Sequence, residues 1–244
     1  MDIGRVALVT GGSRGIGAAI ARRLARDGLR VALTYTASSD RAGQVVREIE
    51  NAGGRAIALR ADAADPDAVT AAVERAAAVF ERMDVLVSNA GVASLGGVEE
   101  LAPEQIDRMI DVNVRGVVHT VRAALPHFGE SGRIITIGSV NAERVPFAGG
   151  AAYAMTKAAV AGLVRGLARD LGPRGITVNN IQPGPTANDR MPADSPAADA
   201  LLRWLALARI ANPEEIAGLV SYLAGPEAAY ITGASLTIDG GFSA

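Results

Sequence analysis

The sequence predicts an α/β fold in which a parallel sheet of about seven strands carries helices on both faces. Short apolar runs alternate along the 244 residues with longer stretches in which apolar residues recur at helical spacing. Most of these runs are hydrophobic at consecutive positions, as expected for strands buried on both faces. Strands that alternate with helices form parallel, doubly wound sheets, because each helix returns the chain to the same end of the sheet.

The individual elements follow from the same pattern. Seven apolar runs are the expected strands, namely Val6–Val9, Val31–Thr36, Ala56–Leu59, Val85–Val87, Ile134–Ile137, Thr177–Ile181 and Ser235–Ile238. Six stretches are the expected helices, namely 15–28, 40–52, 66–81, 103–127, 151–171 and 213–224. Asp65 before Pro66 is a typical helix start, and Asn212 before a proline repeats it. Gly28 and Gly172 are expected to close the C-termini of their helices.

The composition predicts one domain over residues 1–244, because no break divides the chain. Residues 183–200 hold four proline, one glycine and five alanine residues, so we expect a mobile substrate loop at about 183–204 with one short helix. A net charge of −2 gives no reason to expect a nucleic-acid partner. No apolar run is long enough for a membrane span, and residues 1–6 lack the features of a signal peptide. We therefore expect a cytoplasmic protein.

Two residue types are conspicuous by their counts. The chain has no cysteine, which excludes disulfides and thiolate chemistry, and no histidine or carboxylate spacing typical of a metal site. Of 24 basic residues, 23 are arginine, and Lys157 is the only lysine. Lysine offers a compact ammonium with a titratable proton, whereas arginine stays protonated. We therefore expect Lys157 to have a specific role, the alternative being chance survival on a solvated face.

Tyr153 lies four residues before Lys157 within an expected helix, so the two side chains share one face. A phenol has a pKa of about 10, and a nearby ammonium favours the phenolate and lowers that pKa. We expect Tyr153 to donate a proton to an alkoxide or to accept one from an alcohol. The alternative is a core tyrosine beside a surface lysine. Ser139 follows the strand Ile134–Ile137 and could donate to a carbonyl oxygen as charge develops there.

The N-terminal region predicts a dinucleotide site. The strand Val6–Val9 leads into Thr10-Gly-Gly-Ser-Arg-Gly-Ile-Gly17 and then a helix, whose N-terminus can bind a pyrophosphate. This order is typical of a Rossmann fold. The end of the second strand, residues 33–39, has no acid for a ribose hydroxyl, and the first acid, Asp40, starts the next helix. Arg14 and nearby hydroxyls could hold a 2′-phosphate, which predicts NADP(H).

Several motifs in order resemble the short-chain dehydrogenase/reductase family, and the match extends from Val6 to Gly241. Besides the glycine turn, Asn89-Ala90-Gly91 and Pro183-Gly184 are similar to turns of that family. Asp62 resembles its adenine-binding acid, and Asn113, Ser139, Tyr153 and Lys157 resemble its catalytic tetrad, in which Asn113 holds a water. The resemblance implies cofactor contacts from Gly11, Ser13, Arg14, Gly15, Ile16, Gly17, Tyr35, Thr36, Ser38, Asp62, Ala63, Asn89, Ala90, Gly91, Tyr153, Lys157, Pro183, Gly184, Thr186 and Asn188.

The resemblance implies reduction of a ketone, an aldehyde or a 3-oxoacyl carbonyl by hydride transfer, with a small-molecule carbonyl or alcohol as substrate. Asn188 occupies a slot where the family often has a threonine, and Thr186 lies two residues earlier. The substrate pocket is expected from residues 92–97, 140–150 and 183–204. Arg174 matches a basic position used for carrier docking, but its usual partner before the fifth strand is missing, so a free carbonyl compound stays equally open.

Two further expectations come from the family. Residues 137–149 and 165–177 resemble a subgroup that includes a cyclic-di-GMP-binding mediator of biofilm dispersal. A nucleotide-binding regulator on the same scaffold is therefore the alternative function. Members of the family are often homotetramers, and the expected helices 103–127 and 151–171 would supply one interface, where small residues permit close helix contact.

Overall fold

A seven-stranded parallel sheet forms the centre of the structure, a computed structural model that describes residues 4–244. Met1–Ile3, part of the segment in which no signal peptide is expected, lie outside the described residues. The strand order is β3-β2-β1-β4-β5-β6-β7, and every pair is parallel. The strands are β1 (Val6–Val9), β2 (Arg30–Tyr35), β3 (Ala56–Arg60), β4 (Met83–Ser88), β5 (Phe128–Ile137), β6 (Thr177–Pro183) and β7 (Ser235–Ile238).

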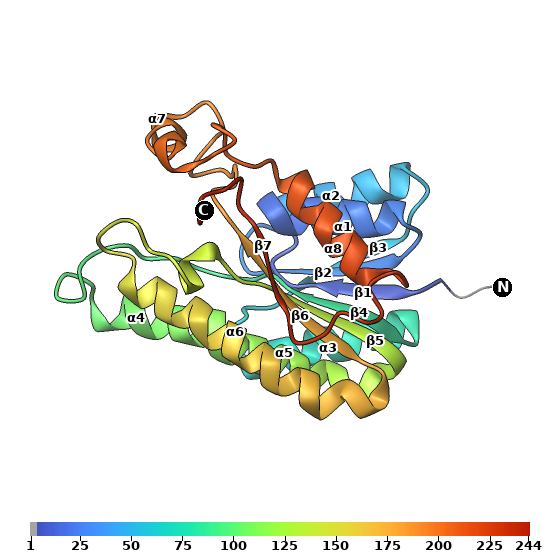
Figure 1. Cartoon of the computed structure of the whole chain (residues 1–244). Helices are drawn as coiled ribbons and strands as arrows, with labels where there is room; N and C mark the ends of the chain where they lie inside the picture. The colour runs from blue at the N-terminus through green and yellow to red at the C-terminus, as the bar shows by residue number, and fades with distance from the viewer. Residues whose placement is uncertain (1–3) are drawn as a thin grey trace.

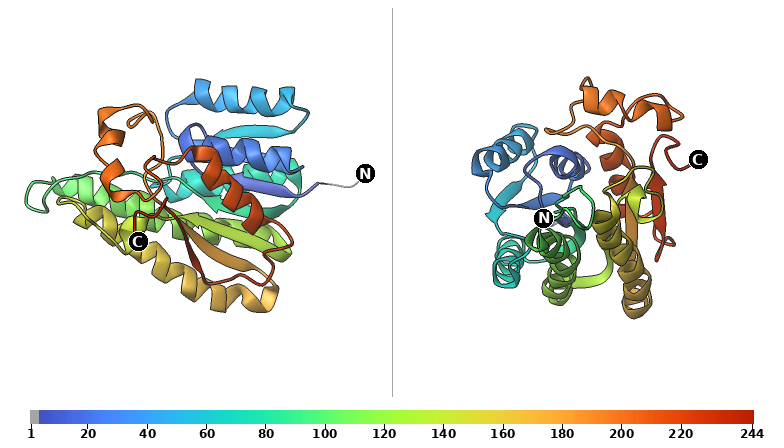
Figure 2. Two further views of the ribbon diagram at one scale, coloured as in Figure 1. Left: turned by 45° about the horizontal axis from the view of Figure 1, so that its top comes forward. Right: turned by 90° about the vertical axis from the view of Figure 1, so that its left-hand side faces the viewer.

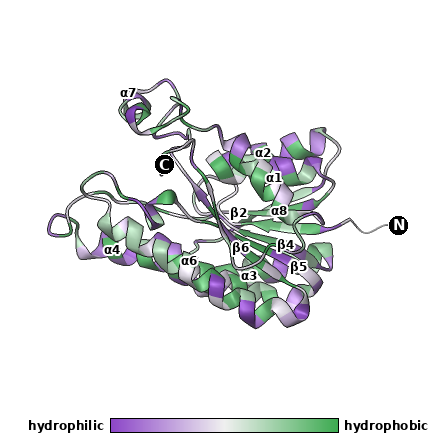
Figure 3. Ribbon diagram, viewed as in Figure 1, coloured by the Kyte–Doolittle hydropathy of each residue, from purple (hydrophilic) through white to green (hydrophobic). Residues whose placement is uncertain are grey.

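Helices cover both faces of this sheet, as the sequence predicts (Figure 1). On one face α1 (Gly15–Arg26), α2 (Ser39–Asn51) and α8 (Pro213–Ala224) pack against the strands in one hydrophobic cluster. On the other face α3 (Pro66–Phe80), α5 (Gly116–Ala124) and α6 (Ala151–Leu171) form a second cluster. Figure 2 shows the two helical layers on either side of the sheet. Figure 3 shows hydrophobic strands between helices of mixed character, which is the pattern of a doubly wound fold.

The expected helix 103–127 is helical throughout but not uniform. It consists of α4 (Pro103–Ile110), a π-helical turn (Asp111–Arg115), α5 and a 3-10 turn (Leu125–His127). The π-helical turn contains Asn113, and such turns often occur at functional sites. A uniform α-helix was expected because five residues are too few to change the hydrophobic period of the whole stretch.

Most of the expected boundaries are confirmed to within about two residues, with two exceptions. Asp65 caps α3 by accepting from the backbone N–H groups of Asp67 and Ala68, and Gly28 follows α1 with a φ of +91°. Gly172 does not close its helix, because its φ is −53° and the chain continues into a 3-10 turn. Gly175, with a φ of +68°, takes the left-handed conformation instead. Strand β5 begins at Phe128, six residues before the expected start.

The segment between β6 and α8 is irregular apart from α7 (Pro196–Asp199) and a 3-10 turn (Leu202–Trp204). It lies at one end of the sheet in Figure 1, beside the C-terminus. Its buried residues form a small hydrophobic cluster with Val140 and Phe242. This segment includes the expected substrate loop, and the expected single short helix within it is α7.

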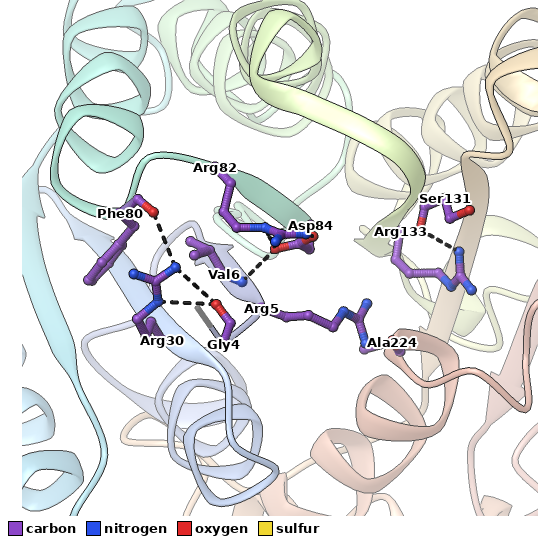
Figure 4. Close-up of polar contacts among 10 residues, drawn as sticks. All are labelled: Gly4, Arg5, Val6, Arg30, Phe80, Arg82, Asp84, Ser131, Arg133 and Ala224. Carbon is purple, nitrogen blue, oxygen red and sulfur yellow. Dashed lines mark hydrogen bonds and ion pairs between the residues drawn. The ribbon is translucent and has the colours of Figure 1, made fainter. Parts of the chain in front are cut away.

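Arginines dominate the opposite, amino-terminal edge of the sheet (Figure 4). Arg5 donates to the carbonyl of Ala224 at 2.8 Å, and Arg30 donates to the carbonyls of Gly4 and Phe80. Arg133 is buried and donates only to the adjacent carbonyls of Ser131 and Gly132. These contacts join the starts of neighbouring strands to each other and to the end of α8. Because they lie at the amino-terminal edge, they leave the carboxyl edge for the candidate site.

Candidate active site

Most of the predicted site residues lie at the carboxyl edge of the sheet, where parallel strands end together. The glycine turn follows β1, Asn89-Ala90-Gly91 follows β4, Ser139 follows β5, and Pro183 ends β6. The strand order places β1, β4, β5 and β6 side by side. These four motifs are far apart in the sequence but are neighbours in space, as the prediction of one shared site requires.

The glycine turn depends on the absence of side chains at specific positions. A Cβ at Gly17 would lie 2.3 Å from the carbonyl oxygen of Gly11 and 2.4 Å from Nδ2 of Asn89, so only glycine fits there. Gly15 has a φ of +52° and nothing within 4 Å of a Cβ position, so the turn is open above it. Arg14 is the N-cap residue of α1, no side chain caps this helix, and its first turn has no acid. The free backbone N–H groups and the helix dipole therefore favour an anion here.

Hydrogen bonds attach this turn to the next motif. The Thr10 hydroxyl accepts from the backbone N–H groups of Asn89 and Ala90, both at 3.0 Å. In return Nδ2 of Asn89 donates to the carbonyls of Thr10 at 2.9 Å and Gly11 at 3.1 Å. The Gly11 N–H donates to the hydroxyl of Thr34 in β2 at 3.2 Å. Thr10 and Thr34 are positioning residues that the sequence prediction missed, although each hydroxyl lies at the end of a buried strand.

The predicted adenosine contacts lie around the ends of β2 and β3. Tyr35 ends β2, Thr36 follows it, and Ser38 is the N-cap residue of α2 but makes no side-chain cap hydrogen bond. The carboxylate of Asp62 accepts from Arg108 at 2.9 and 3.0 Å and from the Ala64 N–H at 3.0 Å. Burial tends to raise the pKa of Asp62, but these hydrogen bonds outweigh it and lower the pKa. Arg108, in α4, therefore holds this carboxylate ionised.

Tyr153, Ser139 and Lys157 come together between β5 and α6. Nζ of Lys157 lies 5.7 Å from the centroid of the Tyr153 ring, as the four-residue spacing predicts. The same Nζ donates to the carbonyl of Ile137, the last residue of β5, at 2.9 Å. The lysine side chain is buried, with 5% of the residue exposed. Ser139 is also buried and accepts from the Asn141 N–H at 3.1 Å, and its hydroxyl is near enough to the Tyr153 phenol to act on the pKa of that group.

The pKa directions correct one expectation. Burial raises the pKa of Tyr153, although part of the residue is exposed, and the nearby Ser139 hydroxyl only partly opposes this effect. The sequence argument expected the ammonium to lower the pKa of the phenol. That argument is wrong for the protein's own residues, because removal of the phenolate from water dominates. Burial also lowers the pKa of Lys157, to about 8, which weakens its hold on a proton near neutral pH.

The side-chain amide of Asn113 makes three hydrogen bonds. Its Oδ1 accepts from the Val92 N–H at 2.8 Å, and its Nδ2 donates to the Val92 carbonyl at 2.8 Å and to the Thr156 hydroxyl at 3.0 Å. A Cβ at Gly91 would lie 3.4 Å from Oδ1 of Asn113 and 3.5 Å from Nζ of Lys157. The amide therefore joins the π-helical turn to α6 and to the turn after β4. Thr156, which the sequence prediction missed, is the third partner.

The loop after β6 begins with a compact set of contacts. The Thr186 hydroxyl donates to the carbonyl of Gly184 at 2.9 Å. Nδ2 of Asn188 donates to the Thr186 carbonyl at 3.0 Å, and its Oδ1 accepts from the N–H groups of Arg190 and Met191. The Asn188 side chain is thus occupied within the loop itself. Thr186 and Asn188 are the two predicted nicotinamide contacts beyond the Pro-Gly turn, and both side chains make hydrogen bonds within the loop.

An aromatic cluster joins two of the three segments expected to form the substrate pocket. The Trp204 ring lies 6.5 Å from Phe147 and 6.2 Å from Phe242, centroid to centroid. Arg203 stacks on Trp204 with its guanidinium carbon 4.2 Å from the ring centroid. Phe147 belongs to the segment after Ser139, and Trp204 belongs to the loop after β6. Apolar contacts therefore hold this loop against the segment that follows the serine.

Two further polar contacts lie outside this edge. Nε2 of His127 lies 3.1 Å from Oε1 of Glu74 on the surface. Arg174 donates to the carbonyls of Leu125 and Phe128 at 3.1 and 3.2 Å, which connects it to the chain's own backbone. Within residues 4–244, no group of three or more side chains could hold a metal ion. No helix of the same region is both long and apolar enough to cross a membrane.

Comparisons with known proteins agree with this geometry. The family described as Enoyl-(Acyl carrier protein) reductase matches residues 11–243. A short-chain dehydrogenase/reductase from Serratia marcescens BCRC 10948 has a solved structure with a TM-score of 0.97 and 57% identity, covering 99% of this chain and 98% of that one. A short chain dehydrogenase from Burkholderia cenocepacia J2315, solved in complex with NADP, has a TM-score of 0.96 and 52% identity over the same shares of the two chains.

One curated relative has a different described function. The cyclic-di-GMP-binding biofilm dispersal mediator protein of Escherichia coli (strain K12) is 47% identical over 241 residues, which covers 99% of this chain and 98% of that protein. All of these matches extend over nearly the full length of the chain. Together with the sheet order and the motifs that meet at its carboxyl edge, they show that the chain belongs to the short-chain dehydrogenase/reductase family of oxidoreductases.

Proposed function

We propose that this protein is an NADP(H)-dependent reductase that converts a ketone, an aldehyde or a 3-oxoacyl carbonyl to an alcohol. The observation that carries the proposal is the buried Lys157 beside Tyr153, with the buried Ser139 near the same phenol. A buried, uncompensated ammonium is costly, and strongly perturbed titratable groups are common at active sites. A purely structural role for the chain's only lysine would be better served by an apolar residue.

The cofactor assignment rests on the glycine turn and the end of β2. The turn is open at Gly15, and the N-terminus of α1 offers uncapped N–H groups to a diphosphate. No acid stands at the end of β2, where Tyr35 and Thr36 lie, and Arg14 supplies a positive charge in the glycine turn. A 2′-phosphate fits this arrangement of charge better than a bare ribose hydroxyl. The complex of the Burkholderia relative with NADP supports the same choice.

In this proposal the side chains handle the proton while NADPH supplies the hydride to the carbonyl carbon. The Ser139 hydroxyl donates a hydrogen bond to the carbonyl oxygen as negative charge develops on it. The Tyr153 hydroxyl then gives its proton to that oxygen. A raised pKa in the protein's own environment keeps the phenol protonated before the reaction, which suits a general acid. In the reverse direction the same oxygen accepts the proton of the alcohol.

Lys157 returns the proton to Tyr153 in this proposal. Its pKa of about 8 lies between that of a free amine and neutral pH, so the ammonium can release a proton without a large penalty. Asn113 is a positioning residue, since its three hydrogen bonds hold the segments around the lysine. The proposal also keeps the water that the family resemblance leads us to expect beside Asn113.

A carbonyl panel with NADPH and NADH tests the function. We expect NADPH oxidation with at least one ketone, aldehyde or 3-oxoacyl compound. Tyr153→Phe should lose at least a hundredfold in kcat, in keeping with the usual contribution of an acid catalyst, while NADPH affinity is retained. Ser139→Ala should show a similar defect, and Ser243→Ala, at the exposed C-terminus, is the matched control. Unchanged turnover by Tyr153→Phe would overturn the assignment.

Binding of cyclic-di-GMP is the second candidate function, because the Escherichia coli relative is described as binding it. Such a regulator could retain the fold and the glycine turn. Calorimetry with cyclic-di-GMP, run beside the carbonyl panel, separates the two. Tight binding of cyclic-di-GMP without turnover of any carbonyl would favour the regulator.

A further inference from the structure

Asp189 lies between two arginines that belong to the proposed cofactor end of the sheet. Its Oδ2 is 3.5 Å from Nη1 of Arg14 and forms a closer hydrogen-bonded ion pair with Nη1 of Arg41. Arg14 lies in the glycine turn as the N-cap residue of α1, and Arg41 is in the first turn of α2, just beyond β2. Asp189 itself comes from the loop after β6. One carboxylate oxygen thus connects three segments that are far apart in the sequence.

The position of Asp189 is set by a tight turn. The N–H and carbonyl groups of Asn188 and Met191 bond to each other, at 3.0 and 3.1 Å, so residues 189 and 190 form the tip. The Asn188 side chain accepts from the N–H groups that follow it, which stabilises the same turn. The hydrogen bond from Arg41 is the largest cause of a lowered pKa at Asp189, so its carboxylate is ionised at neutral pH. The loop therefore presents a fixed negative charge to both arginines.

We propose that Asp189 is an internal competitor for the 2′-phosphate of the cofactor and so determines how well the protein distinguishes NADPH from NADH. This inference rests on the proposed NADP(H) dependence. A 2′-phosphate at Arg14 would compete with the Asp189 carboxylate for the N–H donors and the positive charge of the guanidinium. A phosphate monoester carries about −1.5 to −2 charges and three acceptor oxygens, against −1 for the carboxylate, so the exchange favours the phosphate. NADH lacks the 2′-phosphate, and its diphosphate is the group that the N–H groups at the start of α1 would bind.

The competition also connects cofactor identity to the substrate loop. Displacement of Asp189 from Arg14 releases one of the two ion pairs that hold the turn 188–191 against the glycine turn and α2. We therefore expect the 2′-phosphate, and not the rest of the dinucleotide, to change the mobility of residues 186–192. Hydrogen exchange of this loop should increase with 2′,5′-ADP and stay unchanged with 5′-AMP.

Equilibrium binding of Asp189→Asn to four nucleotides tests the proposal. At low salt we expect 2′,5′-ADP and NADPH to bind Asp189→Asn about two- to fivefold more tightly than they bind the unmodified protein, which is the upper part of the range for an exposed ion pair. Binding of 5′-AMP and NADH should change less than about twofold. The gain should vanish at about 1 M salt, where the screening length is about 3 Å. Asp194→Asn removes the same charge from the same loop, where Asp194 makes no ion pair within residues 4–244, and should leave the ratio unchanged.

Three outcomes would overturn the inference. Equal effects of Asp194→Asn and Asp189→Asn would mean that only net charge matters. Weaker binding of all four nucleotides to Asp189→Asn would mean that Asp189 supports the binding of any cofactor and does not compete with the 2′-phosphate. If Asp189→Asn leaves the ratio of NADPH affinity to NADH affinity unchanged, while the unmodified protein binds NADPH, then Asp189 has no role in cofactor discrimination and the proposed function still stands. If the unmodified protein binds neither dinucleotide, the proposed function itself fails.

Discussion

Replacement of Lys157 by methionine should make the protein more stable while it abolishes turnover. Burial lowers the pKa of the ammonium from 10.5 to about 8. At 1.36 kcal/mol per pKa unit, keeping the charged form inside the protein costs about 3 kcal/mol at pH 7. Methionine fills a similar volume without this cost but loses the hydrogen bond to Ile137, which offsets about 1 kcal/mol. We therefore expect a net gain of about 2 kcal/mol, equivalent to about 4–8 °C in Tm for a chain of this size.

The pH dependence provides the sharper test. Between pH 8 and pH 10.5 the unfolded chain holds the lysine proton more tightly than the folded protein does, so unfolding takes up a proton. The contribution of Lys157 to the free energy of unfolding of the unmodified protein therefore rises with pH across that window. The advantage of Lys157→Met should shrink from about 2 kcal/mol at pH 7 toward zero by about pH 9.5. Urea denaturation at several pH values measures this, with Arg165→Met on the exposed face of α6 as control. A variant that is less stable at every pH would refute the reasoning.

Three further predictions follow from single contacts. Gly17→Ala should lose about 3 kcal/mol of stability and most nucleotide binding, since its Cβ would meet the Gly11 carbonyl at 2.3 Å; wild-type nucleotide affinity would contradict this. Asn113→Ala leaves the N–H and carbonyl of Val92 without partners and should cost about 3 kcal/mol in thermal or urea denaturation. Met155→Glu, where Met155 is 50% exposed on α6, should dissociate the expected tetramer in light scattering, and an unchanged mass would place the interface elsewhere.

Much of the fold could be predicted from the sequence because burial on both faces leaves a direct pattern. The run Val6–Val9 is completely buried in the structure, as its four consecutive apolar residues predict. Helix starts were also readable, since the cap at Asp65 is a local interaction between residues two and three apart. The spacing of Tyr153 and Lys157 was sufficient to place both side chains on one face of α6.

Other features escaped prediction because they depend on neighbours distant in the chain. The π-helical turn around Asn113 is associated with hydrogen bonds to Val92 and Thr156, which lie 21 and 43 residues away. The hydroxyls of Thr10 and Thr34 became recognisable as supports of the glycine turn only when β1, β2 and β4 were placed side by side. Thr10 begins the glycine-turn motif and Thr34 lies in β2, but no local pattern in the sequence shows what their hydroxyls bind.

By itself the sequence determined the alternation of strands and helices, the glycine turn and the pairing of the only lysine with a tyrosine. These are consequences of hydrophobic period, turn chemistry and short-range spacing. The tertiary structure alone decided the direction of the Tyr153 pKa and the contact of Asp189 with Arg41, 148 residues away. Removal from water and the approach of distant charges are set by how the segments pack, and no stretch of sequence encodes either one locally.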